Sequence, residues 1–218
     1  MSNYSWSQFN QKNIRLANEM IKYNKKFKIN YFEKGLYNHI RDIFALSILK
    51  IRKKNNLNIL DYGSNLASLA NLSSKINLNR IKFNIYDPFA KKKIHKYKKF
   101  KLTIFNSTLK NNFFDLIHFG SSIQYINKLV EIDNVINFKK TKLIVITNTP
   151  ISLKNKYQCA QSNHAGLTQY IHNISEIKKF FLKKKFNLIF KSRNDDKFVA
   201  CKKKQKETFS LNLIFERI

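Results

Sequence analysis

Hydrophobic residues recur along this chain with two different periods. Between residues 14 and 25, and again between 37 and 52, they return every three or four positions, which predicts two amphipathic helices. Short apolar runs follow at 57–60, 81–86, 102–105, 114–119 and 142–147, and helical segments are expected at 66–75 and within 123–136. Short apolar strands that alternate with helices predict a parallel, doubly wound sheet.

The last third of the chain has a different pattern. Residues 175–185 predict an amphipathic helix with Ser175 as its N-cap. The strands expected at 186–192 and 208–215 are separated only by a polar, Lys-rich stretch, which permits an antiparallel hairpin. The predicted fold is therefore α/β and Rossmann-like, with a mostly parallel seven-stranded sheet that ends in this hairpin. Because 218 residues suit one substantial core, we expect an N-terminal helical extension over 1–55 and one α/β domain over 56–218.

Two of the predicted strands end in residues suited to a nucleoside-containing cofactor. The first runs Asn58-Ile-Leu-Asp-Tyr-Gly63, and Gly63 allows a sharp turn with positive φ at little cost. The second ends at Asp87, whose carboxylate can accept hydrogen bonds from both hydroxyls of a ribose. Taken singly, Gly63 also fits an ordinary strand-to-helix turn, and Asp87 before Pro88 fits the start of a loop.

The residues after Gly63 narrow the choice of cofactor. Ser64, Asn65, Leu66 and Ala67 supply no second glycine to make room for a pyrophosphate, which argues against NAD and FAD. S-adenosylmethionine carries no phosphate, so it needs one close backbone approach and a nearby polar or acidic group. Asp61 can supply that group, and the pattern therefore favours S-adenosylmethionine.

The formal charge of +29 raises the alternative of a nucleic-acid partner. However, 36 of the 42 basic residues are Lys, whereas nucleic-acid surfaces usually favour Arg. Asn, Ile and Phe are abundant while Gly and Pro are scarce, so much of the charge fits a skewed codon composition. The densest basic run, residues 91–101, is the best candidate for a polyanion contact. An RNA partner stays an alternative that is not favoured.

Other functional classes find little support in the sequence. The apolar stretches are too short to cross a bilayer, and the start of the chain lacks the pattern of a signal peptide, so we expect no membrane span and a cytoplasmic protein. Cys159 and Cys201 belong to no metal-ligand motif, which predicts two free thiols and no metal site. Nothing in the pattern sets an oligomeric state.

Four segments carry a resemblance to a known family. Beside Arg41-Asp42 in the second predicted helix, the chain reads Ile59-Leu-Asp-Tyr-Gly-Ser-Asn65, Phe119-Gly-Ser-Ser-Ile-Gln-Tyr-Ile126 and Ile144-Val-Ile-Thr-Asn-Thr-Pro150. It resembles a family of bacterial class I S-adenosylmethionine-dependent methyltransferases, which read Leu-Asp-Phe-Gly-Gly-Ser, Ser-Ser-x-Leu-Gln-Tyr and a strand ending in Arg-Thr-Pro at these places. The chain departs from the family at Ser64 and Ala67, where glycine is usual, and at Asn148, where the family has Arg.

The resemblance implies a role for each matching position. Asp61, Tyr62, Gly63, Ser64 and Asn65 would lie at the methionine end of the cofactor, and Asp87 with Pro88 at its ribose. Asn106 and Ser107 would face the adenine, although a loop or N-cap role is the alternative. Ser121 and Ser122 would border the methyl group, although Ser122 also fits the cap of a following helix.

The methyl acceptor is less well defined than the cofactor. A general base is needed only for a hydroxyl or a protonated amine, and the candidates at the open end of the sheet are Tyr125, Gln124 and His164, of which His164 has the best pKa for the task. Among the other histidines, His118 is expected to be buried and hydrogen-bonded, His172 to lie on a helix surface, and His39 and His95 to face solvent. The sequence predicts a methyltransferase for a small-molecule or glycan acceptor, with an RNA methyltransferase or a non-catalytic protein of this fold as alternatives.

Overall fold

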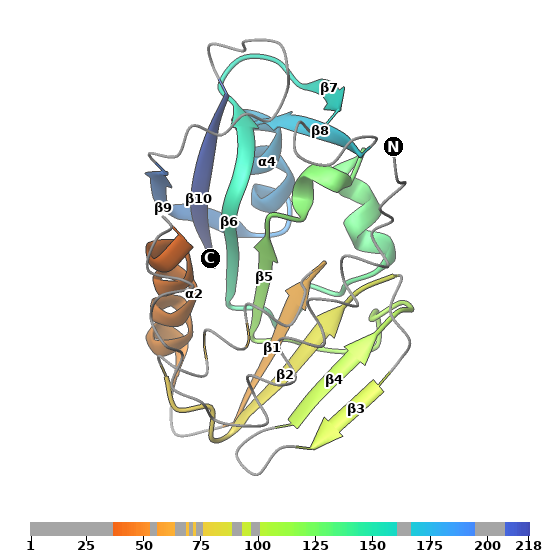
Figure 1. Ribbon diagram of the computed structural model, residues 1–218, viewed down its shortest axis with the longest axis vertical. Coiled ribbons are helices and arrows are strands. Elements are labelled where there is room, and N and C mark those ends of the chain that lie inside the picture. The colour runs from red at the N-terminus through yellow and green to blue at the C-terminus, as the bar shows by residue number, and fades with distance from the viewer. Residues whose placement is uncertain are drawn as a thin grey trace, which may run out of the picture.

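The fold is built on one continuous, mostly parallel sheet (Figure 1). The computed structural model describes residues 37–52, 56–63, 69, 72, 76–88, 93–96, 101–160, 167–194 and 208–218, without the side chains of 37–41 and 93–96. Its strands are β1 (Leu57–Tyr62), β2 (Ile81–Tyr86), β3 (Lys93–Lys96), β4 (Lys101–Phe105), β5 (Leu116–Gly120), β6 (Leu143–Ser152), β7 (Tyr157–Ala160), β8 (Thr168–Asn173), β9 (Phe186–Arg193) and β10 (Thr208–Arg217). The helices are α2 (Tyr37–Ile51), α4 (Ile174–Leu182) and the 3-10 helices η2 (Ile123–Tyr125) and η3 (Leu129–Asn134).

The strand order confirms the predicted doubly wound sheet. Its main path is β3-β4-β2-β1-β5-β6-β10-β9, with β8 beside β6 and β7 beside β8. The strands β4, β2, β1, β5 and β6 run parallel to one another, whereas β10 is antiparallel to both β6 and β9. The seven strands from β4 to β9 match the predicted sheet and its C-terminal hairpin. The sequence did not predict β3, β7 and β8.

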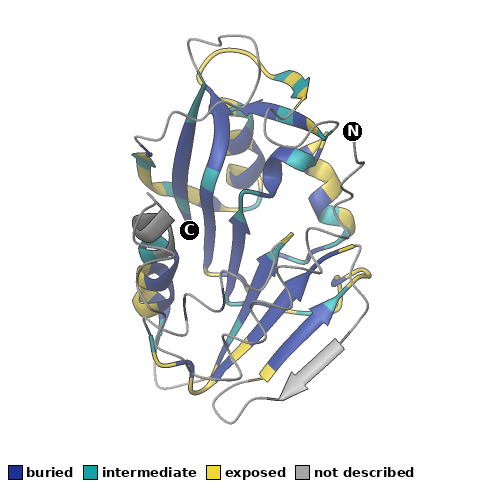
Figure 2. Ribbon diagram, viewed as in Figure 1, coloured by how far each residue is buried: buried dark blue, intermediate teal, exposed yellow. Residues whose placement is uncertain are grey.

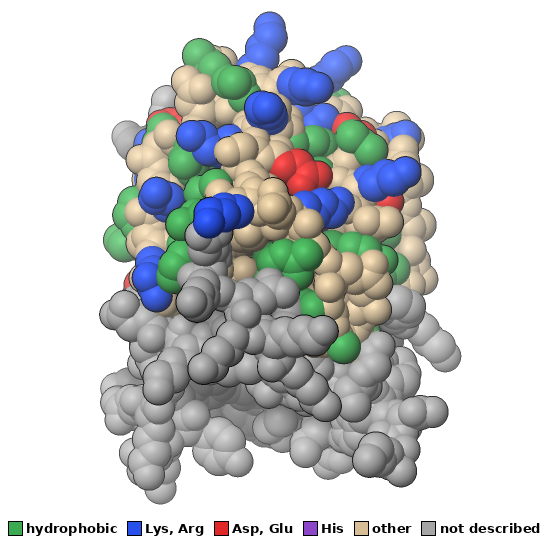
Figure 3. Space-filling view, turned by 90° about the horizontal axis from the view of Figure 1, so that it is seen from above, with side chains coloured by type: hydrophobic (Ala, Val, Ile, Leu, Met, Phe, Trp, Pro, Cys, Tyr) green, Lys and Arg blue, Asp and Glu red, His purple; other side chains and the backbone are tan. Residues whose placement is uncertain are grey.

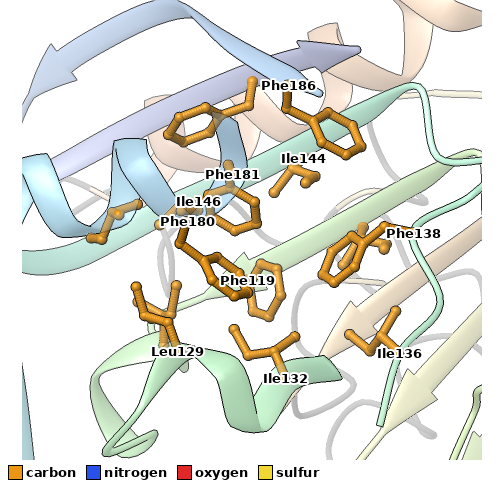
Figure 4. Packing of buried hydrophobic residues seen from close by; sticks show 14 of the residues in the cluster. Phe119, Leu129, Ile132, Ile136, Phe138, Ile144, Ile146, Phe180, Phe181 and Phe186 are labelled. Atoms are coloured by element: carbon orange, nitrogen blue, oxygen red, sulfur yellow. The ribbon is translucent and has the colours of Figure 1, made fainter. Parts of the chain in front are cut away.

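Two hydrophobic cores cover the opposite faces of the sheet, because successive side chains of a strand point to opposite sides. Ile59 and Val145 belong to the core beneath α2, whereas Leu60 and Ile144 belong to the core beneath α4 and η3. The central strands are buried over most of their length (Figure 2). A group of aromatic side chains fills the second core between the sheet, α4 and η3 (Figure 4): Phe119, Phe138, Phe180, Phe181 and Phe186.

The helical segments expected within 123–136 are the short helices η2 and η3. Local structure differs from the sequence predictions in two other places. Asn173, not Ser175, is the N-cap of α4, because its side chain accepts a hydrogen bond from the Ser175 amide. Cys159 on β7 is disulfide-bonded, so the expectation of a free thiol was wrong for this residue.

Several predictions fall on residues outside the described ranges. These are the helix at 14–25, most of the helix at 66–75, and the side chains at the centre of the basic run 91–101. The predicted boundary at residue 55 stays a prediction, although α2 itself packs against β6. Within the described part of the chain, no helix has the length and hydrophobicity needed to cross a membrane.

Candidate functional site

The carboxyl ends of three neighbouring strands bring the predicted cofactor residues together. Tyr62 pairs with Tyr86, and Tyr86 pairs with Phe105, so the next residues leave the sheet side by side. The Gly63 amide donates to the Tyr86 carbonyl over 2.7 Å, and the Asp87 amide donates to the Phe105 carbonyl over 2.9 Å. Ligands of open α/β sheets bind at this edge, where the chain turns away from the strands.

Gly63 makes the close approach that its motif predicted. Its φ is +68°, a left-handed conformation that glycine adopts without strain. A Cβ atom at this position would lie 2.7 Å from the Cβ atom of Ser122, closer than two carbon atoms can pack. The turn after β1 therefore lies directly against the residue that follows β5. Ser64 and Asn65 lie outside the described residues.

Asp61 is fully buried on the α2 face of β1. Its Oδ1 lies 2.8 Å from His118 Nδ1, and His118 Nε2 lies 2.8 Å from Thr147 Oγ1. The ring of Phe44 stacks on the imidazole at 4.0 Å. The second carboxylate oxygen, Oδ2, has no hydrogen-bond partner among the residues that the structure describes. His118 is thus buried and hydrogen-bonded, as predicted, while Asp61 keeps one acceptor free.

Asp87 is also buried, with 5% of its surface exposed, whereas Pro88 is exposed. Tyr86, just before it, has its pKa raised by burial and by the charge of Asp87. Burial likewise raises the pKa of Tyr62, whose ring lies 4.8 Å from that of Tyr86. Both phenols therefore stay protonated at neutral pH. The side chain of Tyr62 belongs to the core on the α4 face, opposite Asp61.

Ser121 and Ser122 follow β5 in two different environments. Ser121 has a φ of +53°, and its hydroxyl donates to the Asn148 carbonyl over 2.8 Å. Ser122 occupies the N-cap position of η2, but its side chain makes no capping hydrogen bond. The Ser122 hydroxyl is buried and has no partner among the described residues. Helix capping therefore does not account for Ser122.

The helix η2 adds Gln124 and Tyr125 beside these serines. Gln124 is buried and its Oε1 lacks a hydrogen-bond partner within the described ranges, whereas Tyr125 is half-buried. His172, on β8, is 1% exposed and not on a helix surface, so that prediction was wrong. Its Nε2 lies 2.8 Å from the Ile126 carbonyl at the end of η2, and burial lowers its pKa. The candidate base His164 lies outside the described residues.

Asn148, near the middle of β6, is held by polar residues of β10. Its backbone φ is +48°. Its side-chain Oδ1 accepts a hydrogen bond from the Ser210 hydroxyl over 2.8 Å, and its backbone amide donates to Asn212 Oδ1 over 2.9 Å. Asn148, at the position where the resembled methyltransferases have Arg, thus ties β6 to β10. The polar residues Ser210 and Asn212, which alternate with apolar residues between Phe209 and Leu213, are the sequence signal that was missed.

The chemistry of the assembled residues suits one kind of ligand. Two buried carboxylates on adjacent strands, Asp61 and Asp87, repel phosphate and attract hydroxyl or ammonium donors. Asn106 and Ser107 lie exposed after β4, in reach of solvent. Among the described residues there is no cluster of metal-binding side chains. The site therefore fits a ligand that is rich in hydrogen-bond donors and free of phosphate.

Figure 3 looks onto the end of the molecule toward which β5 and β6 point. In the described part of this face, Lys and Arg side chains are scattered among hydrophobic and other groups. No continuous basic surface is visible there.

Comparisons with known proteins identify solved structures with a similar fold. No family model and no curated protein sequence matches the chain. Among solved structures, it is similar to magnesium protoporphyrin IX methyltransferase (ChlM) from Synechocystis PCC 6803 with bound SAM, at 13% identity and a TM-score of 0.50, over 96% of this chain and 84% of that one. It is also similar to the 1,6-didemethyltoxoflavin-N1-methyltransferase of Burkholderia thailandensis with bound S-adenosylhomocysteine, at 7% identity and a TM-score of 0.53, over 100% and 92% of the two chains.

A third solved structure shares the fold under a different activity. The [4+2]-cyclase SpnF matches at 8% identity with a TM-score of 0.52, over 83% of this chain and 80% of that one. At such low identities these likenesses establish the Rossmann-like methyltransferase fold alone. The activity must be argued from the site.

Proposed function

We propose that this protein is an S-adenosylmethionine-dependent methyltransferase that acts on a small-molecule or glycan acceptor. The observation that carries the proposal is the convergence of the left-handed Gly63 turn with two buried carboxylates, Asp61 and Asp87, at the carboxyl edge of the sheet. These groups match a ligand with a ribose and an ammonium group and without phosphate. The fold, which the solved methyltransferases share, is consistent with this proposal.

Each residue has a proposed part in holding the cofactor. The free Oδ2 of Asp61 would accept from the amino group of the methionine end, and Gly63, with Tyr62, Ser64 and Asn65, would border it. Asp87, beside Pro88, would accept from the ribose hydroxyls, because an ionised carboxylate satisfies two donors at once. Asn106 and Ser107 would face the adenine, and Ser121 and Ser122 would border the methyl group.

The protein residues would act mainly by alignment. S-adenosylmethionine, when bound, supplies a methyl group that the sulfonium has already activated. The chain then has to hold the acceptor in line and keep water out. Tyr125 would orient the acceptor through its hydroxyl, and His164 would take a proton where the acceptor is a hydroxyl or a protonated amine.

The small-molecule acceptor is favoured over RNA by the kind of basic residue in the chain, because 36 of the 42 are Lys whereas nucleic-acid surfaces usually favour Arg. The two methyltransferases above are named for small molecules, which agrees with this choice. A second candidate, a protein of this fold that does not transfer methyl groups, is favoured by one observation. The structure of SpnF is described as that of a [4+2]-cyclase.

Calorimetric titration with S-adenosylhomocysteine tests the cofactor site. We expect micromolar binding to the wild type and a loss of at least about tenfold in Asp87→Ala, because a charge-assisted hydrogen bond contributes about 1.5–3 kcal/mol. Glu216→Ala is the control, since it removes a half-buried carboxylate from the far end of β10, where Glu216 forms an ion pair with the exposed Lys50. It should bind like the wild type.

Two results would contradict the proposal. An absence of binding at millimolar S-adenosylhomocysteine would end the cofactor assignment. If Asp87→Ala and Glu216→Ala weakened the binding of S-adenosylhomocysteine equally, Asp87 would not be a cofactor-binding residue. Binding without transfer of a labelled methyl group to any sugar, lipid intermediate or RNA offered would favour the non-methylating alternative.

A further inference from the structure

A basic pocket of about 480 Å³ lies away from the candidate cofactor site. It opens beside the turn that follows α4, the end of η3 and the start of β6. Six of its ten lining residues are Lys or Arg and one is acidic. Across the whole chain, 42 of 218 residues are basic, so the pocket is far richer in positive charge than the composition alone explains.

The one acidic residue of the pocket is already neutralised. Asp133 lies 2.6 Å from Lys184 Nζ, and this ammonium group also lies 4.6 Å from the centre of the Phe180 ring. Lys184 is thereby held in the wall of the pocket. Lys139, Lys183 and Lys185 are exposed and form no ion pair with a described acidic residue. The pocket thus keeps an excess of positive charge.

Arg217 supplies a fixed cation at the end of β10. Its Nε donates to the Thr141 carbonyl over 2.6 Å, a second guanidinium nitrogen donates to the Phe138 carbonyl, and its guanidinium stacks 4.4 Å from the centre of the Phe186 ring. Neutral carbonyls hold this group, and within the described part of the chain no carboxylate pairs with it. Partial burial lowers its pKa, so its charge is imperfectly solvated. A bound anion would relieve that cost.

From this geometry we infer that the pocket binds a phosphorylated small molecule carrying two or more phosphate groups. Lys offers mobile point charges and Arg a planar fork of donors, both of which suit phosphate oxygens. The pocket volume lies within the range of small-molecule sites, about 300–1,000 Å³. A single carboxylate ligand would leave most of these cations unmatched.

The pocket is independent of the proposed cofactor site. Lys139 precedes β6, and the Arg217 amide donates to the Lys142 carbonyl next to the amino-terminal end of β6. Gly63 and Asp87 follow the opposite, carboxyl ends of β1 and β2. A ligand in the basic pocket would therefore leave the cofactor edge free, and the two sites can be tested separately.

Calorimetry with inorganic tripolyphosphate at about 0.15 M salt tests the inference on the full chain. The pocket variant is Lys139→Gln with Lys183→Gln, and the control variant is Lys178→Gln with Lys179→Gln, which removes two exposed lysines of α4 outside the pocket. We expect tripolyphosphate to bind the wild type, with a Kd raised about tenfold or more in the pocket variant and less than about twofold in the control. Affinity for S-adenosylhomocysteine should be the same in all three proteins.

A short single-stranded RNA serves as the competing probe. If tripolyphosphate does not bind the wild type, the inference is wrong. The inference also fails if both variants lose affinity equally, since binding would then follow overall charge. If RNA binds more tightly than tripolyphosphate, and both variants weaken it alike, the lysines form a general polyanion surface and no phosphate pocket exists.

Discussion

Among single residues, Gly63 makes the sharpest prediction. An alanine there would have to keep a φ of +68° and would place its Cβ 2.7 Å from that of Ser122. We expect Gly63→Ala to lower the free energy of unfolding by about 2–3 kcal/mol, from left-handed strain and from overpacking. Urea denaturation followed by circular dichroism measures the change.

The double variant Gly63→Ala with Ser122→Gly separates these two causes. It removes the overlap of the two Cβ atoms and keeps the backbone strain. We expect it to regain about 1 kcal/mol or more relative to Gly63→Ala alone. A double variant no more stable than the single one would mean that the turn does not pack against Ser122.

Sequence reasoning predicted Asp61 and His118 one at a time, but not their pairing. The two residues lie 57 positions apart and meet because Asp61 pairs with His118 in the register of β1 and β5. A shift of one residue would turn one of the two side chains to the opposite face. The register is set by burial along the whole length of both strands, so it cannot be read from a motif of seven residues. The positions of Gly63 and Asp87 follow from strand ends, and were predictable for that reason.

At the scale of elements, apolar runs identified the buried strands and missed the polar ones. The run at 143–146 is continuously apolar because both faces of this parallel strand are buried. The strand β8, Thr-Gln-Tyr-Ile-His-Asn, mixes polar and aromatic residues and pairs with β6 at only two positions. The strand β8 is held in place by contacts with β6, β7 and η2. The hydrophobic pattern of residues 168–173 alone does not reveal these contacts.

His172 on β8 makes the stability of the protein depend on pH. Burial lowers its pKa below the ordinary value of 6.5, against the opposing effects of Glu176 and of the hydrogen bond to the Ile126 carbonyl, while Lys156 lowers it further. The unfolded chain therefore binds a proton more readily than the folded protein does. The contribution of His172 to stability is complete above pH 6.5 and is lost as the pH falls toward the folded-state pKa.

Urea unfolding of the wild type and of His172→Gln between about pH 5 and pH 8 checks this prediction. Other groups also titrate in this range, so the informative quantity is the difference between the two proteins. The wild type should lose more stability than His172→Gln on acidification. Parallel curves would show that His172 is not the group responsible.

For the whole molecule, the parallel, doubly wound class of sheet was predictable, although its strand order and much of the local structure were not. Alternating apolar runs and helical segments permit few other arrangements, because crossovers between parallel strands are long and right-handed. The hairpin of β9 and β10 followed from the absence of a helix between two strands. The basic pocket was not predictable, because Lys110, Asp133, Lys183 and Arg217 come from four segments that only the packed sheet brings together.

The charge of the whole chain leads to the last prediction. With a net charge of +29, repulsion among lysines opposes the compact state, and exposed ion pairs such as those in the described part of the chain offset little of it. Added salt screens charges that lie more than about 10 Å apart. We therefore expect the free energy of unfolding in urea to rise by about 1 kcal/mol or more between 0.05 and 0.5 M NaCl, on the order of the screened repulsion. KCl should act equally at the same ionic strength. A decrease would mean that attractive ion pairs outweigh the repulsion, and a matching rise in sucrose alone would point to solvent exclusion instead of screening.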